Sequence, residues 1–449
     1  MMTICAPATP VGGAIAVIRI SGSETFTLLS KVFTKDIHDA KGYTVHYGSI
    51  KNGDETVDEV LVTVFRAPHS YTGEDSAEIS CHASAYIVRE ILNVLIANGA
   101  TAAEPGEFTM RAFMNGKMDL SQAEAVADLI ASANKASHDI AISQLRGGFS
   151  SELSMLREQL LKLTSLLELE LDFSDHEELE FADRSELRAL ALNIDSRITS
   201  LAKSFELGKA IKDGIPVAIV GKTNVGKSTL LNRLLHEDKA IVSSIHGTTR
   251  DVIEDTTVIN GCTFRFIDTA GIRKTADEIE QLGIERTFTK LHEARIVLWV
   301  VDSEPTKEEL SEAQHLAEGK SLIVVRNKID ANPDCNNGSN TKQDNTLLYI
   351  SAKNGTGIQR LEAAIFAAAD IPEIRQGDVI VTNARHYGIL CRAHEEIQRV
   401  INSIELGYSG DLITEELHPL LHTLASITGG EISTPETLNN IFHHFCIGK

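Results

Sequence analysis

The sequence predicts a multidomain chain of α+β and α/β architecture, with an N-terminal α+β domain, a helical bundle domain and an α/β domain inserted into the bundle. Three observations predict it. Short strand patterns separated by turns occupy residues 1–118, and a helical leucine pattern without proline follows from 119 to 214. An apolar strand, a glycine loop and a helix then succeed one another from 215 to 234, which is typical of a mostly parallel, doubly wound sheet.

The N-terminal domain is expected over residues 1–118. Ile15–Ile20 and Glu59–Phe65 show the alternation of half-buried strands. Asn52-Gly53 lies between them and is a hairpin signal. These signals favour an α+β domain.

The helical domain is expected to comprise residues 119–214 and 375–449, with the third domain, residues 215–374, inserted between them. Leucines that step by three and four indicate a face that packs on partner helices; they are Leu153, Leu156, Leu160, Leu163 and Leu167. The acidic run 172–186 is interpreted as a solvated connection, with a direct functional role as the alternative. Asn383 is placed to cap the first helix after the insertion.

Composition excludes several classes of protein. The 449 residues are 43% hydrophobic and carry a formal net charge of −21, so a globular chain is expected that does not bind nucleic acid by bulk electrostatics. The six cysteines form no C-x-x-C pair and indicate free thiols. We expect a cytoplasmic protein outside the membrane, because no stretch is long and apolar enough to span one and the N-terminus lacks a signal-peptide pattern.

The segment Gly221–Ser228, GKTNVGKS, is a complete phosphate-binding loop between a strand and a helix. Its glycines let backbone N–H groups surround phosphates, and the helix N-terminus adds partial positive charge. Lys227 is placed to neutralise phosphate charge and Ser228 to hold Mg²⁺. If the motif is taken alone, a chance match in a glycine-rich loop is the alternative.

Four further motifs follow in the order that a GTPase requires. Thr248–Asp251 suits a loop that closes over the γ-phosphate, and Asp268–Gly271 suits contacts with Mg²⁺ and that phosphate. The aspartate of Asn327–Asp330 can accept from both N1–H and the exocyclic amine of guanine, which adenine cannot satisfy. Ser351–Lys353 can contact the guanine carbonyl through backbone N–H. The set predicts a GTPase whose ligand lies at the carboxyl ends of parallel strands.

The sequence leaves two features of the GTPase chemistry open: the group that orients the attacking water, and the role of Asn224. Ile272 stands where Ras-like enzymes have a glutamine that orients water, so another group must do this. Asp277–Glu280 offers three carboxylates, or is a solvated acidic turn. Asn224 is a candidate cation ligand beside the phosphates, or a turn former.

The motifs resemble those of the MnmE (TrmE) family of tRNA modification GTPases, over essentially the whole chain. The resemblance rests on GTTRD at 247–251, DTAGIR at 268–273, YTGED at 71–75, PGEF at 105–108 and CIGK at 446–449. It implies a homodimer that works with a flavin-dependent partner, MnmG (GidA), in a heterotetramer. Together they would add an aminomethyl or carboxymethylaminomethyl group to C5 of the wobble uridine, U34, of certain tRNAs.

The resemblance further implies that the N-terminal domain dimerises and binds 5,10-methylene- or 5-formyl-tetrahydrofolate as one-carbon donor. By motif position the folate contacts would be Arg19, Glu78, Lys117 and Lys449. Without the family, Arg19 and Lys117 are surface ion-pair partners and Glu78 is a carboxylate on a strand face. Cys446 would be a thiol near the modification site, or else a small buried residue.

In the GTPase domain the resemblance implies K⁺-dependent hydrolysis, with Glu280 as the catalytic, water-orienting carboxylate. The implied K⁺ ligands are Asn224, Ser243, Ile245 and Thr248, and the implied Mg²⁺ ligands are Ser228 and Thr249. The expected GTP contacts are Asn224, Val225, Gly226, Lys227, Ser228, Thr229, Ser243, Ser244, Ile245, His246, Gly247, Thr248, Thr249, Asp268, Thr269, Ala270, Gly271, Asn327, Lys328, Asp330, Ser351, Ala352 and Lys353.

A regulatory GTPase of ribosome assembly, without folate chemistry, is the competing interpretation. It would usually carry a basic RNA-binding appendage, which a chain of net charge −21 does not show. The tRNA-modification interpretation requires a folate pocket and a terminal Cys-x-Gly-Lys, and the sequence offers signals for both.

Overall fold

The computed structural model describes residues 2–172, 184–236, 255–267, 293–331, 347–371 and 378–430, together with Leu438, Ile441, Phe442, Phe445 and Gly448. The chain forms two compact units. The first unit comprises residues 1–130, 144–195 and 392–449, and the second comprises 131–143 and 196–391. Helices α7 (Arg184–Asp213) and α13 (Ala384–Glu405) each contain a boundary between the units.

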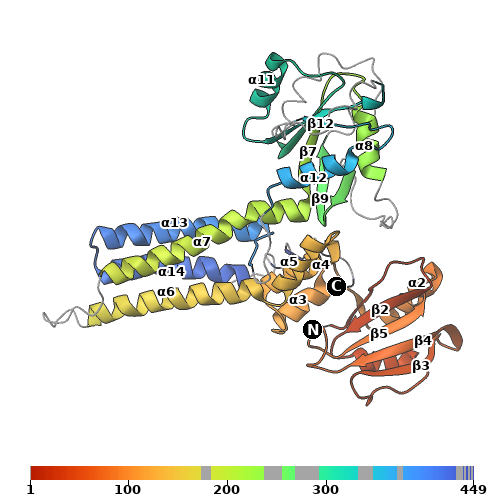
Figure 1. The fold of residues 1–449 in the computed structure, drawn as a ribbon. Helices are drawn as coiled ribbons and strands as arrows, with labels where there is room; N and C mark the ends of the chain where they lie inside the picture. Colours follow the sequence, from red (N-terminus) through yellow and green to blue (C-terminus); the bar gives the residue numbers. More distant parts are fainter. Residues whose placement is uncertain are drawn as a thin grey trace. The chain divides into compact units, whose positions relative to one another are not determined.

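A six-stranded sheet in the order β3-β4-β5-β2-β1-β6 begins the first unit (Figure 1). Its strands are β1 (Ile4–Pro7), β2 (Ile15–Ser21), β3 (Thr44–Asn52), β4 (Glu55–Phe65), β5 (Ser76–His82) and β6 (Thr101–Ala102). The predicted strands 15–20 and 59–65 and the hairpin at Asn52-Gly53 are confirmed, and Gly53 has the positive φ (+60°) that favours glycine. Helices α1 (Thr25–Val32) and α2 (Ala85–Ala97) pack on one face, where the alternate apolar residues of the strands form the core.

The opposite face of this sheet carries the residues that alternate with the core. One row across four neighbouring strands consists of Val45, Thr63, Glu78 and Arg19. Helix α3 (Glu107–Met114) meets this face at β1, where Phe108 packs against Ile4 and Ala6. At β3 and β4 large apolar side chains stay exposed, so this face is covered only in part.

The helical part of the first unit contains α4 (Leu120–Ala131), α6 (Gly148–Asp172), α14 (Gly410–Thr428) and the adjoining segments of α7 and α13. In Figure 1, α6, α7, α13 and α14 run alongside one another. The leucine stripe of α6, Leu153 to Leu167, is buried, which confirms the predicted packing face. Asn383 Oδ1 accepts from the Arg385 N–H at 2.8 Å, so the predicted cap of α13 is confirmed as well.

The second unit contains a sheet in the order β12-β11-β10-β7-β9-β8. Its strands are β7 (Ile215–Val220), β8 (Asp255–Ile259), β9 (Cys262–Ile267), β10 (Ile296–Val301), β11 (Ser321–Arg326) and β12 (Leu347–Tyr349). All neighbouring pairs are parallel except β8 with β9. Helices α5 (Lys135–Leu145), α8 (Lys227–His236), α11 (Lys307–Leu316) and α12 (Ile358–Ala368) and the 3₁₀ turn η1 (Ile329–Ala331) complete it. This is the predicted α/β architecture, and the carboxyl ends of β7, β10, β11 and β12 lie at one edge.

Candidate functional site

The loop between β7 and α8 passes very close to two neighbouring strand ends. Gly221 (φ +149°) lies so near β10 that an added Cβ would stand 2.2 Å from the Val300 carbonyl oxygen. Gly226 (φ +96°) lies so near β11 that an added Cβ would stand 2.3 Å from Asn327 Nδ2. Only glycine fits both positions, so the sequence of this loop is dictated by its path across the strand ends.

Lys227 begins α8, and its ammonium group folds back into the loop. Nζ donates to the carbonyl oxygens of Gly221 and Lys222, at 2.7 Å each. Partial burial lowers the pKa of Lys227 below its ordinary value. Ser228 and Thr229 are exposed in the first turn of the same helix, and Asn224 is exposed with φ +63°. The Lys227 ammonium group and the N-terminus of α8 thus meet at this loop, an arrangement that suits a phosphate chain.

Asn327 joins three of the predicted motifs. Its side chain is buried; Nδ2 donates to the Val225 carbonyl at 2.9 Å, and Oδ1 accepts from the Ala352 N–H at 2.9 Å. Its own N–H donates to the Val301 carbonyl at the end of β10, at 2.8 Å. The structure therefore brings together the phosphate loop, the 327–330 motif and the 351–353 motif through one amide side chain.

Asp330 lies in η1 and points to the neighbouring loop. Ser351 Oγ donates to Asp330 Oδ1 at 2.6 Å, and this bond, together with the nearby Lys353 and Lys328 ammonium groups, lowers the carboxyl pKa. Lys328 has φ +64° and lies 3.9 Å from Asp302 Oδ2. The result is an ionised carboxylate of fixed orientation, open to solvent, beside the 351–353 loop.

Arg233 was not predicted from the sequence as part of this site. It lies on α8, and its Nη2 donates to the Lys353 carbonyl at 2.9 Å. Its Nε makes a longer bond, 3.4 Å, to the Ala352 carbonyl. The helix that begins at Lys227 therefore also contacts the loop that follows β12.

Several predicted residues lie outside the described residues. They are Ser243, Ser244, Ile245, His246, Gly247, Thr248, Thr249, Asp268, Thr269, Ala270, Gly271, Glu280, Cys446 and Lys449. The acidic segment 173–183 also lies outside them. The roles given to these residues stay predictions.

In the N-terminal domain, Arg19 on β2 and Glu78 on β5 face each other in register. Arg19 Nη2 and Nε donate to Glu78 Oε1 at 2.7 and 3.0 Å. The guanidinium carbon lies 5.3 Å from the Tyr71 ring centre and 5.7 Å from that of Phe108. Arg19 Nη1 also donates to the carbonyl of Gly448 at 3.1 Å, so the last described residue of the chain reaches this ion pair.

Lys117 lies on the other side of the turn that follows Tyr71. Its Nζ donates to the Pro68 carbonyl at 3.0 Å, and its stem is close to Gly73. The structure thus brings together Arg19, Glu78 and Gly448 directly, whereas it relates Lys117 to them only through the 71–73 turn.

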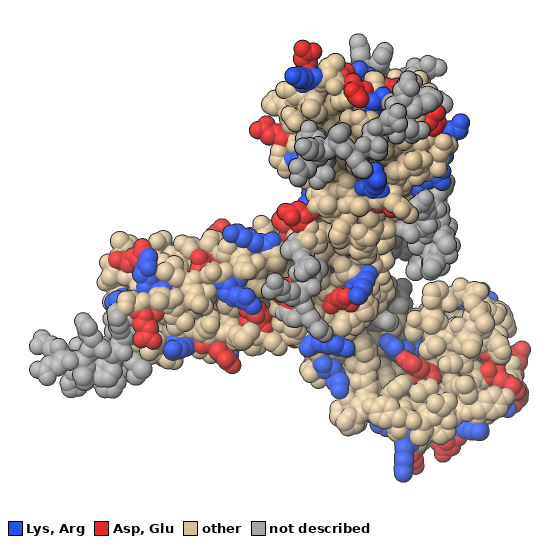
Figure 2. Space-filling model, in the orientation of Figure 1, with Lys and Arg blue, Asp and Glu red and all other residues tan. Residues whose placement is uncertain are grey.

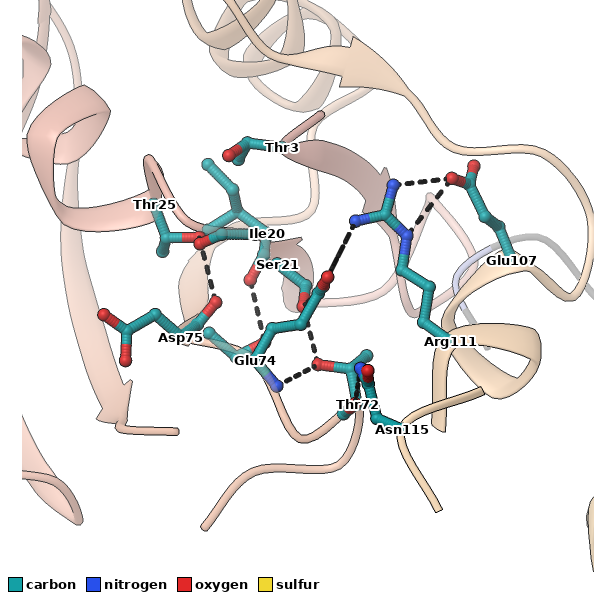
Figure 3. Close-up of polar contacts among 12 residues, drawn as sticks. Thr3, Ile20, Ser21, Thr25, Thr72, Glu74, Asp75, Glu107, Arg111 and Asn115 are labelled. Carbon is teal, nitrogen blue, oxygen red and sulfur yellow. Dashed lines mark hydrogen bonds and ion pairs between the residues drawn. The ribbon is translucent and has the colours of Figure 1, made fainter. Parts of the chain in front are cut away.

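A buried polar network explains the position of that turn (Figure 3). Arg111 on α3 is 4% exposed and lies between two carboxylates: Nη1 is 3.1 Å from Glu74 Oε2, and Nη2 is 2.7 Å from Glu107 Oε1. Ser21 Oγ donates to Glu74 Oε2 at 3.0 Å, and Asn115 Nδ2 donates to the Thr72 carbonyl at 2.7 Å. The YTGED and PGEF motifs therefore meet through Arg111, which the sequence analysis did not single out.

The described residues of the C-terminal segment pack on α3 and α4. Leu438, Ile441, Phe442 and Phe445 form a cluster with Met110, Phe113, Met118, Leu120 and Ala123. An added Cβ at Gly106 (φ +70°) would stand 2.6 Å from the Phe442 carbonyl oxygen. Leu438, Ile441 and Phe442 therefore belong to the face through which this segment contacts α3 and α4.

Comparison with known families agrees with this arrangement. A family described as GTP-binding protein TrmE N-terminus matches residues 3–117, and one described as MnmE helical domain matches residues 120–446. The tRNA modification GTPase MnmE of Parabacteroides distasonis is 55% identical over 462 residues, covering 100% of both chains. That of Bacteroides fragilis is 53% identical over 463 residues, covering 100% of this chain and 99% of the relative.

The chain belongs to the MnmE family of tRNA modification GTPases.

Among solved structures, the G domain of the T. maritima FeoB iron transporter is similar to 35% of this MnmE-family chain and to 99% of its own, with 24% sequence identity and a TM-score of 0.25. Within the described ranges, no helix is long and apolar enough to cross a membrane. The same ranges contain no group of three or more His, Cys, Asp or Glu side chains that could hold a metal ion.

Proposed function

We propose that this MnmE-family chain is a K⁺-dependent GTPase that acts with the flavin-dependent MnmG to add an aminomethyl or carboxymethylaminomethyl group to C5 of U34 in certain tRNAs. The observation that carries the proposal is the Asn327 side chain, which connects the phosphate loop to the 351–353 loop beside Asp330. This geometry suits a guanine nucleotide, with phosphates at one loop and the base at the other. The proposed domains are residues 1–118, 119–214 with 375–449, and 215–374.

The chain's own residues suggest how GTP is held. Lys227 would exchange its bonds with the loop carbonyls for contacts with phosphate oxygens, whose negative charge binds an ammonium group more strongly than a neutral carbonyl does. Asp330 would accept from N1–H and the exocyclic amine of guanine. Ser228 and Thr249 would be ligands of Mg²⁺, which neutralises charge on the phosphates. Glu280 would orient the attacking water.

Asn224 supports the proposed K⁺ site. It lies within the phosphate loop with a left-handed backbone conformation (φ +63°) and an exposed side chain, and an amide oxygen is a suitable ligand for K⁺. Ser243, Ile245 and Thr248 would complete the ligand set. A monovalent cation there would stabilise charge that develops on the phosphates, as an arginine does in other GTPases.

The N-terminal site fits tetrahydrofolate in its chemistry. Glu78 supplies an acceptor for pterin N–H groups, the Arg19 guanidinium bonded to it holds that carboxylate in place, and Tyr71 supplies an aromatic ring beside them. Lys117 and Lys449 would add positive charge. The bound folate would supply one carbon, as 5,10-methylene- or 5-formyl-tetrahydrofolate, with Cys446 as a thiol near the modification site.

The partly covered sheet face supports a homodimer through the N-terminal domain. Val45, Tyr47 and Leu61 are 59%, 54% and 46% exposed on neighbouring strands, in or beside the row that contains Arg19 and Glu78. Exposed apolar side chains that adjoin one another favour an interface. On the side drawn in Figure 2, most of the surface of this domain is formed by residues other than Lys, Arg, Asp and Glu. A second copy of the chain would cover this face.

Charge favours recognition of tRNA through the complex with MnmG. The net charge is −21, and on the side drawn in Figure 2 the described basic side chains lie scattered among acidic ones. A protein of this kind gains little from counterion release on its own. We place the reaction in the cytoplasm, in a heterotetramer with MnmG.

Two measurements on the purified chain test the proposal. GTP turnover is compared in KCl and NaCl at equal ionic strength, and fast turnover is expected only in KCl. Binding of 5-formyl-tetrahydrofolate is followed by calorimetry, with Arg19→Ala expected to lose binding and Arg89→Ala, on α2, expected to keep it. Equal turnover in both salts would refute the K⁺ site, and a wild-type chain without folate binding would favour a regulatory GTPase without folate chemistry.

A further inference from the structure

We propose that Arg233 is a positioning residue for guanine recognition, acting through the backbone of the 351–353 loop. This inference rests on the proposed function, since it concerns the site where the base of GTP would lie. It assigns to α8 a second role, because the helix that presents Lys227 and Ser228 to the phosphates would also fix the loop that reads the base.

Helix geometry makes this arrangement possible. Arg233 follows Lys227 by six residues, which corresponds to about 9 Å along a helix axis. The long side chain of arginine then spans the remaining gap to the carbonyl oxygens of Ala352 and Lys353, at 3.4 and 2.9 Å. Several N–H donors in a fixed plane suit two adjacent carbonyls, which the single ammonium of lysine matches less well.

Peptide geometry determines what these bonds do to the loop. In a trans peptide the C=O and the following N–H point in opposite directions. When Arg233 binds the Ala352 carbonyl, the Lys353 N–H must therefore point away from α8. The neighbouring donors already have partners, since the Ala352 N–H binds Asn327 and the Asn354 N–H binds Ser351 Oγ at 3.2 Å. The geometry directs the Lys353 N–H outward, where it can donate to the carbonyl O6 of guanine.

Base analogues separate this role from a general role in folding. GDP carries O6, whereas the diphosphate of 2-aminopurine riboside lacks it. Arg233→Ala should weaken GDP binding about tenfold, the usual effect of a lost hydrogen bond of this kind. It should leave binding of the 2-aminopurine nucleotide unchanged within about twofold, and kcat at saturating GTP should be kept because the phosphate end is intact.

Two further variants complete the experiment. Arg233→Lys retains a cation with a single donor nitrogen and should keep part of the GDP affinity that Arg233→Ala loses. Asn232→Ala, on the exposed side of the same helix, should match the wild type. Equal weakening of both nucleotides, or unchanged GDP binding in Arg233→Ala, would overturn the assignment. A wild-type chain that binds neither nucleotide would instead overturn the proposed nucleotide site, and the role of Arg233 with it.

Discussion

The nucleotide site and the N-terminal site differ in the groups that build them. The loop 221–226 and the 351–353 loop present mainly backbone groups, and glycines at 221 and 226 are required by close approach of strand ends. The N-terminal site is made of side chains that lie far apart in sequence, such as Arg19 with Glu78 and Arg111 with Glu74. A site made of backbone is encoded locally, whereas a site made of paired charges depends on sheet register and on buried partners. Substitutions should therefore affect the two sites differently.

Arg111→Met should give the largest effect. It leaves Glu74 and Glu107 partly buried without their cation, and breaking such a pair costs about 3–5 kcal/mol of unfolding free energy. Urea unfolding is measured by far-UV circular dichroism and by fluorescence of Trp299, the single tryptophan, which lies on β10 in the second unit. The unfolding transition of the first unit, followed by circular dichroism, should move to a lower urea concentration. The transition reported by Trp299 should occur at the same urea concentration as in the wild type.

The triple variant Arg111→Met, Glu74→Gln, Glu107→Gln is the control for that prediction. It removes the uncompensated charges and should recover part of the lost stability. An Arg111→Met chain that unfolds like the wild type would show that the network in Figure 3 contributes nothing to the fold of the N-terminal domain.

Asn327→Ala should destabilise the second unit and leave the first unit unaffected. The substitution leaves the Val225 carbonyl and the Ala352 N–H without their partner inside the protein, at a cost of about 2–3 kcal/mol. The Trp299 transition should move to lower urea while the first unit is unaffected, and GDP affinity should fall with it. Asn327→Asp keeps the acceptor oxygen, so its Trp299 transition and its GDP affinity should lie between those of the wild type and those of Asn327→Ala. If only the first unit is destabilised, the assignment of Asn327 to the nucleotide site is wrong.

Asp330→Asn should change ligand preference without changing stability, because the Asp330 side chain is open to solvent. The amide reverses one donor–acceptor pair, so GTP affinity should fall by about 100-fold or more while xanthosine triphosphate is gained as a ligand. Competition between the two triphosphates measures this directly. Retained preference for GTP would mean that Asp330 does not read the base.

Lys222→Ala should have the smallest effect. Lys222 and Glu309 form an ion pair of 2.8 Å, yet both side chains are exposed. Solvent and salt screen such a pair, so neither unfolding transition should move measurably. A clear shift of the Trp299 transition would contradict the expectation that exposed ion pairs contribute less to stability than buried ones.

The sequence predicted the second unit in more detail than the first. The strand at 215–220, the glycine loop and the motifs after β11 and β12 follow rules of local conformation, and the carboxyl ends of parallel strands bring them together. Arg233 carries no comparable signal, because its contact with Lys353 depends on how α8 packs. The position of Arg111 four residues after Glu107 was the available hint of an ion pair, but its second partner, Glu74, follows only from the tertiary structure.

The bond between Arg19 and Gly448 can form only late in biosynthesis. These residues are 429 positions apart, so at ordinary elongation rates the ribosome needs roughly 20–90 s to synthesise the segment between them. The second unit is complete in sequence at residue 391, before the last segment of the first unit is made. During that interval Met110, Phe113 and Leu120 lack the C-terminal residues that pack against them. The nascent chain thus exposes this apolar surface of α3 and α4 until Phe445 has been synthesised, and a chaperone would act during that interval.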